Sequence, residues 1–270
     1  MTTSELSRHV SSRDGTPIAL FESGSGAPLL LVHGTAGDHT TFRVVGPRLA
    51  QAYAIVSIDR RGRRASGDTS PYSIEREFED VAVVVEGLAA EANGPVAVFG
   101  HSYGGRCALG AALLTDAIGR VICYEGAPPP PGRSYRPPGL ADRLRARLAA
   151  NDPAGLLATF MTGVVGMTAA ELETYRADPV WPRRVAAAMT IPRELEAETT
   201  PAASLDALGM VRQPVLQLLG SASLPVFRAA TVALDERLDD GRIVEIGGAK
   251  HAAHHTHPDV VVDAIRAFLA

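Results

Sequence analysis

The chain has 270 residues, of which 46% are hydrophobic and 21% are charged, and its formal net charge is −4. This length fits one large domain, or a core with an inserted segment, and the composition is ordinary for a folded globular protein. A negative net charge argues against a general nucleic-acid binder or a binder of anionic membranes, because both need an excess of Lys and Arg.

Residues 1–10 are polar and lack the apolar stretch of a secretory signal. No segment approaches the roughly 18 uninterrupted apolar residues of a membrane span, so we expect a cytoplasmic protein with no membrane partner. The two cysteines, Cys107 and Cys123, lie in apolar runs, which favours buried reduced thiols over a disulfide or a metal site. A basic cluster at 60–64 is interpreted as loop charge, with steering of an anionic substrate as the alternative.

Short apolar runs alternate with longer segments of helical period, which predicts an α/β protein with a mostly parallel central sheet and helices on both faces. The expected strands are 17–21, 28–32, 54–58, 96–99, 121–124, 215–219 and 242–246. The expected helices include 74–92, 103–114, 227–237 and 258–269.

The segment 127–205 interrupts this alternation, because it shows helical patterns and no convincing strand. It opens with four consecutive prolines at 128–131, which forbid a helix and stiffen the boundary. We therefore expect a core made of 1–126 and 206–270, with 127–205 inserted as a helical cap. Apolar cap residues expected to face a ligand, unless they pack in the core, are Phe160, Met161, Met167, Trp181 and Met189.

The most informative motif is G-x-S-x-G at 100–104, between an apolar strand pattern and a helix pattern. Gly100 and Gly104 allow strand and helix backbones to approach closely at a sharp turn, where a Cβ would clash. Ser102 is therefore expected in a strained conformation with an exposed hydroxyl. Such a turn presents one serine as a nucleophile.

Four local features, in this order and spacing, make the chain resemble serine hydrolases of the α/β-hydrolase fold family. They are the strand and loop 29–36, the loop 59–66, the turn at Ser102 and the C-terminal stretch 248–258. The resemblance covers nearly the whole chain outside 127–205. It implies an α/β-hydrolase core and acyl chemistry, and we expect no cofactor and no metal.

Acyl transfer needs two hydrogen-bond donors aimed at the oxygen on which negative charge develops, the oxyanion hole. The backbone N–H of Tyr103 follows the nucleophile at a helix N-terminus, where unpaired amides and the helix dipole favour an anion. The resemblance implies the N–H of Thr35 as the second donor, and Gly34 leaves room for that backbone to approach a ligand. The alternative is that Thr35 is an ordinary loop residue.

A serine hydroxyl needs a base, and a histidine that titrates near neutral pH suits this task. Four histidines lie near the end of the chain, at positions 251, 254, 255 and 257. The resemblance favours His251, because the family's catalytic histidine lies in the loop after the last strand. The other three are expected at the rim or facing the cap, with a metal site as a less favoured alternative. His33 and His101 are expected to be structural.

The third member of the triad must be a carboxylate that orients the histidine. In the family it usually follows the penultimate strand, but residues 220–224 contain no acid. Some members place it after the strand that follows the nucleophile helix, and Glu125 ends that strand here. We therefore predict Glu125 as the acid. The alternatives are that Glu125 begins the cap and pairs with a surface arginine, or that Asp59, more usually a loop-fixing residue, is the acid.

Together these features predict a serine hydrolase that cleaves a carboxylic ester or related acyl bond of a small, largely apolar substrate through an acyl-enzyme on Ser102. A serine at this turn argues against epoxide hydrolases and haloalkane dehalogenases, which resemble this fold but use aspartate there. A carbon–carbon bond hydrolase, a cofactor-free lyase or oxygenase, and a non-catalytic binding protein stay open. The oligomeric state, monomer or homodimer, is open as well.

Overall fold

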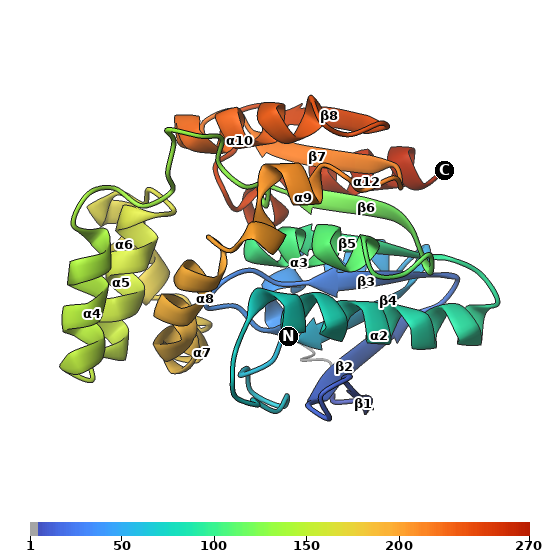
Figure 1. The fold of residues 1–270 in the computed structure, drawn as a ribbon, viewed down its shortest axis with the longest axis horizontal. Helices are drawn as coiled ribbons and strands as arrows, with labels where there is room; N and C mark the ends of the chain where they lie inside the picture. Colours follow the sequence, from blue (N-terminus) through green and yellow to red (C-terminus); the bar gives the residue numbers. More distant parts are fainter. Residues whose placement is uncertain (1–4) are drawn as a thin grey trace.

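An eight-stranded sheet forms the centre of the computed structural model, which describes residues 5–270 (Figure 1). Residues 1–4, the start of the polar N-terminal stretch, lie outside this range. The strand order is β1-β2-β4-β3-β5-β6-β7-β8. The strands are β1 (Arg8–Ser11), β2 (Pro17–Gly24), β3 (Ala27–Val32), β4 (Tyr53–Asp59), β5 (Val96–His101), β6 (Ile118–Tyr124), β7 (Val215–Gly220) and β8 (Gly241–Ile246).

The strands from β4 to β8 pair in parallel, whereas β2 pairs antiparallel with both β1 and β4. The predicted mostly parallel sheet is therefore confirmed. Strand β1 was not predicted, because its four residues carry only one aliphatic side chain. Its main role is to add an antiparallel edge beyond β2.

Helices cover both faces of the sheet, as predicted. Successive residues of β3 point to opposite faces, so Leu30 packs in one hydrophobic cluster and Leu31 in the other. One face is covered by α2 (Ile74–Ala92), α3 (Tyr103–Ala112) and α10 (Pro225–Asp235). The other is covered by α1 (Gly46–Leu49), α11 (Ala253–Thr256) and α12 (Pro258–Leu269).

Between β6 and β7 the structure contains helices and no strand. These are α4 (Leu140–Ala149), α5 (Pro153–Gly163), α6 (Ala169–Arg176), α7 (Trp181–Ala187), α8 (Ile191–Ala197) and α9 (Leu205–Leu208). Helices α4 to α8 lie together at one end of the sheet, on the left in Figure 1. The division into a core and a cap at 127–205 stays a prediction, and this segment is called the predicted cap below.

The arginines of the loop after β4 are mostly buried. Arg60, Arg61 and Arg63 are at most 1% exposed, and only the Arg64 side chain reaches solvent, at 44%. The interpretation as loop charge is therefore wrong for three of the four. Arg61 binds both oxygens of Asp80, at 2.7 and 2.6 Å. A buried guanidinium needs such a partner, because an unpaired charge in the interior is strongly unfavourable.

Both cysteines are buried and free, as predicted. Burial raises the pKa of Cys123 to about 12, which removes it as a thiolate nucleophile near neutral pH. Within residues 5–270, no helix is long and apolar enough to cross a membrane.

Candidate active site

Ser102 lies on a strained turn between β5 and α3, as predicted. Its backbone has φ 54° and ψ −124°, a combination that L-residues rarely adopt outside functional sites. The two flanking glycines make the turn possible. A Cβ on Gly104 would lie 2.2 Å from the carbonyl oxygen of Val32, and one on Gly100 would lie 2.3 Å from that of Gly104. No other residue fits these positions without moving backbone.

Glu125 and His251, 126 positions apart in the chain, are brought together. The Nδ1 atom of His251 lies 2.5 Å from Oε2 of Glu125, and the two side chains are 6% and 0% exposed. A carboxylate accepts hydrogen bonds, so this contact places the imidazole proton on Nδ1 and leaves Nε2 free to accept one. Glu125 therefore does not pair with a surface arginine, which contradicts that alternative.

The loop after β7 holds the other oxygen of Glu125. Oε1 accepts hydrogen bonds from the backbone N–H of Gly220 at 2.8 Å and from the hydroxyl of Ser223 at 2.6 Å. This loop, where the acid usually lies in the family, thus supplies donors to an acid from the neighbouring strand. Sequence reasoning missed Ser223. The sequence did contain a signal for it: residues 220–224 include two serines and no carboxylate, so this loop can donate hydrogen bonds to an acid from another strand.

The loop that carries His251 is braced by residues next to the other two predicted triad members. His101 precedes Ser102, and its Nε2 donates to the carbonyl of His251 at 2.8 Å. Tyr124 precedes Glu125, and its hydroxyl accepts from the N–H of Ala253 at 2.9 Å and donates to the carbonyl of Lys250. Burial holds the pKa of His101 well below its usual value. The predicted structural role of His101 fits this neutral donor.

Phe227 of α10 completes the surroundings of the histidine ring. Its ring stacks on His251, with centroids 4.4 Å apart and an interplanar angle of 29°. Within the described chain, no hydrogen bond joins the Ser102 hydroxyl to His251. Such contacts are often long without substrate and shorten when it binds.

Among the other C-terminal histidines, His254 differs from the prediction. His254 is 2% exposed and packs against His101 and Phe42, because the short helix α11 turns it inward; the expected rim position is wrong. Burial and the nearby Arg43 lower the pKa of His255 to about 3. In residues 5–270 there is no group of three or more His, Cys, Asp or Glu side chains placed to hold a metal ion.

Asp59, the alternative acid, is fully buried away from His251. Its Oδ1 accepts from the N–H of His39 at 2.9 Å and contacts Nδ1 of the same histidine at 2.8 Å. The Ser66 hydroxyl donates to the Asp59 carbonyl and accepts from the N–H of Ala19 at 2.8 Å. Asp59 and Ser66 therefore hold the loop 59–66 in place, which is the loop-fixing role that Asp59 more usually has in the family.

A small cavity of about 30 Å³ collects four of the five predicted site residues, all except His251. It is lined by Thr35, Ser102, Tyr103, Arg106, Glu125, Tyr135, Phe160, Val164, Leu195, Glu198 and Phe227. Walls from the predicted cap meet walls from the sheet edge here. The cavity therefore leaves room for a small group beside Ser102, between the sheet edge and the predicted cap.

One wall of this cavity is polar, which the sequence did not predict. Arg106, one helical turn after Ser102, donates from Nη1 to Glu198 at 2.9 Å. Its Nε and Nη2 donate to the carbonyls of Gly126 and Ala127, at 3.3 and 3.2 Å. Burial raises the pKa of Glu198 even though Arg106 opposes this shift. A ligand in this cavity meets an ion pair as well as apolar side chains.

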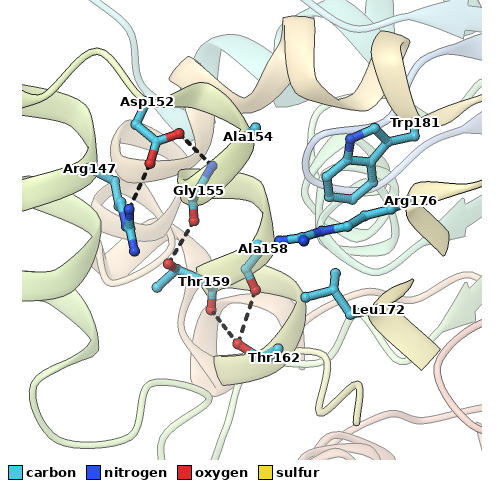
Figure 2. A pocket seen from close by; sticks show the side chains of 10 residues that line it. All are labelled: Arg147, Asp152, Ala154, Gly155, Ala158, Thr159, Thr162, Leu172, Arg176 and Trp181. Carbon is cyan, nitrogen blue, oxygen red and sulfur yellow. Dashed lines mark hydrogen bonds and ion pairs between the residues drawn. The ribbon is translucent and has the colours of Figure 1, made fainter. Parts of the chain in front are cut away.

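Of the five apolar residues expected to face a ligand, only Phe160 lines this cavity. Trp181 lines a separate cavity of about 590 Å³ formed within the helices of the predicted cap (Figure 2). There the guanidinium of Arg176 lies 5.9 Å from the Trp181 ring. Met189 is 39% exposed. Helical spacing alone did not indicate which side of a cap helix faces the sheet.

Comparisons with known proteins agree with this architecture. The profile described as "Alpha/beta hydrolase family" matches residues 29–264. The structure is similar to that of an alpha/beta hydrolase from Sphaerobacter thermophilus DSM 20745, with a TM-score of 0.80 and 32% sequence identity over 96% of this chain and 100% of that chain. It is also similar to an esterase from Exiguobacterium antarcticum, with a TM-score of 0.80 and 18% identity over 97% and 99% of the two chains. The second likeness shows the fold alone.

Matches to curated proteins are shorter. A stretch of 107 residues is 34% identical to "Probable oxidoreductase EphD" of Mycobacterium tuberculosis (strain ATCC 25618 / H37Rv). It covers 38% of this chain and 18% of that protein, so the match spans less than a fifth of the relative's length. The profile, by contrast, covers most of the chain, including the serine turn and the histidine loop. The chain belongs to the alpha/beta hydrolase family.

Proposed function

We propose that the chain is a serine hydrolase that cleaves a carboxylic ester, or a related acyl bond, through an acyl-enzyme on Ser102. His251 takes the serine proton and later activates water, and Glu125 holds the imidazole in the tautomer that this requires. The backbone N–H groups of Thr35 and Tyr103 stabilise the oxyanion. The observation that carries this proposal is the 2.5 Å contact between His251 Nδ1 and Glu125 Oε2.

The cavity beside Ser102 supports a short acyl group. Its volume is about 30 Å³, which leaves room for only a few heavy atoms. Among acyl groups we therefore expect acetyl to need the least rearrangement, whereas a long chain requires the predicted cap to move. The Arg106–Glu198 pair adds a polar contact to this cavity. We therefore propose a small substrate that has both polar and apolar groups, instead of the largely apolar substrate expected from the sequence.

Turnover of p-nitrophenyl esters tests the proposal. We expect steady release of p-nitrophenol by the wild type, fastest with acetate and slower along the series to octanoate. Ser102→Ala should remove this activity, whereas Ser25→Ala, at an exposed serine outside the site, should not change it. A fluorophosphonate should label the wild type at Ser102 in step with loss of activity.

The same experiment separates the rival functions. Ester turnover that persists in Ser102→Ala would contradict the acyl-enzyme. Absence of turnover together with absence of labelling would favour a binding protein. Labelling of Ser102 that leaves activity intact would favour chemistry without an acyl-enzyme, as in a cofactor-free lyase.

A further inference from the structure

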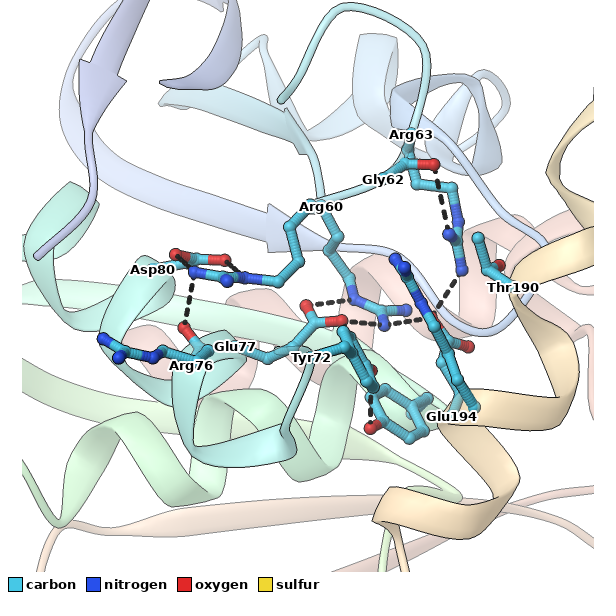
Figure 3. A network of polar contacts seen from close by, with 12 residues as sticks. Arg60, Gly62, Arg63, Tyr72, Arg76, Glu77, Asp80, Thr190 and Glu194 are labelled. Atoms are coloured by element: carbon cyan, nitrogen blue, oxygen red, sulfur yellow. Dashed lines mark hydrogen bonds and ion pairs between the residues drawn. The ribbon is translucent and has the colours of Figure 1, made fainter. Parts of the chain in front are cut away.

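Figure 3 shows a buried ion network. The network contacts Tyr103 and the Thr35 side chain, the two residues proposed to form the oxyanion hole. We define the network as Arg60, Arg63, Glu77 and Glu194, whose side chains are all at most 1% exposed. The two arginines come from the loop after β4, Glu77 from α2 and Glu194 from α8. Glu194 is therefore the one member that belongs to the predicted cap.

The four charges balance through short contacts. Arg60 binds the Glu77 carboxylate through Nε and Nη2, at 3.0 and 2.7 Å. One oxygen of Glu194 lies 2.5 Å from Nη2 of Arg60 and 2.5 Å from Nη2 of Arg63. Burial tends to raise the pKa of Glu194, but the two arginines and the nearby Thr35 hydroxyl outweigh it and lower that pKa. The carboxylate therefore stays charged in the interior.

Arg60 also contacts the loop that leads to Thr35. Its backbone N–H donates to Nε2 of His33 at 3.1 Å, and its Nη1 donates to the His33 carbonyl at 3.3 Å. His33 lies two residues before Thr35 and is fully buried. The position of this loop is thus tied to the guanidinium of Arg60.

The same guanidinium contacts Tyr103, the other proposed oxyanion residue. Its central carbon lies 4.5 Å from the centroid of the Tyr103 ring. The Tyr103 hydroxyl bonds the Tyr72 hydroxyl at 2.9 Å, and Tyr72 donates in turn to Glu77 at 2.9 Å. Both sides of the hole are therefore attached to one network of charges.

We infer that Arg60 and Glu194 are positioning residues for the oxyanion hole, and that Glu194 makes the alignment of the hole depend on the docking of the predicted cap. This inference rests on the proposed function. Oxyanion donors act only when they are held about 2.7–3.1 Å from the developing charge. A small displacement of the Thr35 or Tyr103 backbone therefore lowers kcat and leaves substrate affinity nearly unchanged.

Glu194→Gln tests this role, because it keeps the shape of the side chain and one acceptor oxygen but removes the charge. We expect kcat to fall roughly 10- to 100-fold, less than for the loss of a whole donor, with KM changed less than about twofold. An aryl boronic acid, which forms a tetrahedral anion on Ser102, should bind more weakly by the same factor as kcat/KM falls. Binding of p-nitrophenol, the leaving group, should change less than about twofold, because it has no carbonyl oxygen to place in the hole.

Two further variants separate positioning from stability. Asp68→Asn breaks the other ion pair of α8, between Asp68 and Arg193 at 2.7 and 3.0 Å, and should leave kcat within about twofold of the wild type. The double variant Arg63→Gln with Glu194→Gln removes one charge of each sign. It restores the balance of buried charge, so it should melt close to the wild-type temperature while kcat stays low.

Three outcomes contradict the inference. Wild-type kcat and boronate affinity in both Glu194 variants would show that the network only stabilises the fold, while Ser102 chemistry stands. Recovery of kcat in the double variant would assign the loss to unbalanced charge rather than to position. Absence of Ser102-dependent turnover in the wild type would remove the proposed function, and the oxyanion hole with it.

Discussion

Glu125→Gln is the sharpest test of Glu125 as the proposed triad acid. The two oxygens of Glu125 have different tasks, because Oε1 accepts from Gly220 N–H and Ser223 hydroxyl while Oε2 faces His251 Nδ1. A glutamine that keeps its oxygen at the Oε1 position turns its NH2 group toward Nδ1. The imidazole must then carry its proton on Nε2, where it cannot accept the serine proton.

The opposite orientation of the glutamine amide is also unfavourable. It restores an acceptor for Nδ1 but sets its NH2 group against the N–H of Gly220, which leaves a buried donor unpaired at a cost of about 1–3 kcal/mol. The unproductive tautomer is therefore favoured. We expect kcat to fall about 10³- to 10⁴-fold, which corresponds to about 4–5 kcal/mol in the activation barrier.

The assay is p-nitrophenyl acetate hydrolysis, with circular dichroism to verify that the variant is folded. Ser223→Ala is the matched control, since it removes one bond to Oε1 but leaves the charge, and it should lower kcat less than about tenfold. A folded Glu125→Gln variant that keeps more than a tenth of wild-type kcat would refute this reasoning. The serine and histidine would then suffice as a pair.

Two further predictions follow from the structure. Gly104→Ala places a methyl group 2.2 Å from the Val32 carbonyl oxygen; overpacking of this kind costs about 1–3 kcal/mol, so the melting temperature should fall by roughly 2–12 °C in calorimetry, and an unchanged melting temperature would contradict the steric argument. The pKa of His255 is lowered to about 3, whereas an unfolded histidine titrates near 6.5, so the unfolded chain binds the extra proton and stability should fall as pH drops from about 6.5 to 3. His255→Asn should make this decline shallower in urea melts, and equal slopes would contradict it.

Local patterns predicted the elements that carry the proposed site residues. The helix at 74–92 was predicted with its observed bounds, because Ser73 caps its start by accepting from the N–H of Arg76 and an apolar face continues to Leu88. The serine turn depends on Gly100 and Gly104, which lie within two residues of Ser102 and so form a local motif. The contact of Glu125 with His251 agrees with the family resemblance that suggested this position, and the carboxyl ends of parallel strands meet at one edge of the sheet.

The sequence did not reveal which distant charged residues pair with one another. Arg60 and Glu194 lie 134 positions apart, and neither residue has a local signal that names its partner. The same holds for Arg106 and Glu198, which are 92 positions apart. A charged residue next to a loop usually remains in solvent, so the loop interpretation was reasonable until the fold brought carboxylates to it. Burial of His254 depends likewise on the packing of a short helix.

The pairing of β5 with β6 has a consequence for how this site tolerates change. His101 and Tyr124 are direct neighbours in the register of the two strands, and each immediately precedes a residue that lines the cavity beside Ser102. Since consecutive side chains on a strand point in opposite directions, a shift by one position in either strand would exchange a supporting residue for a proposed catalytic one. Insertions or deletions within these strands should therefore abolish function outright, whereas changes in length at the opposite ends, before Val96 and Ile118, leave the alternation intact.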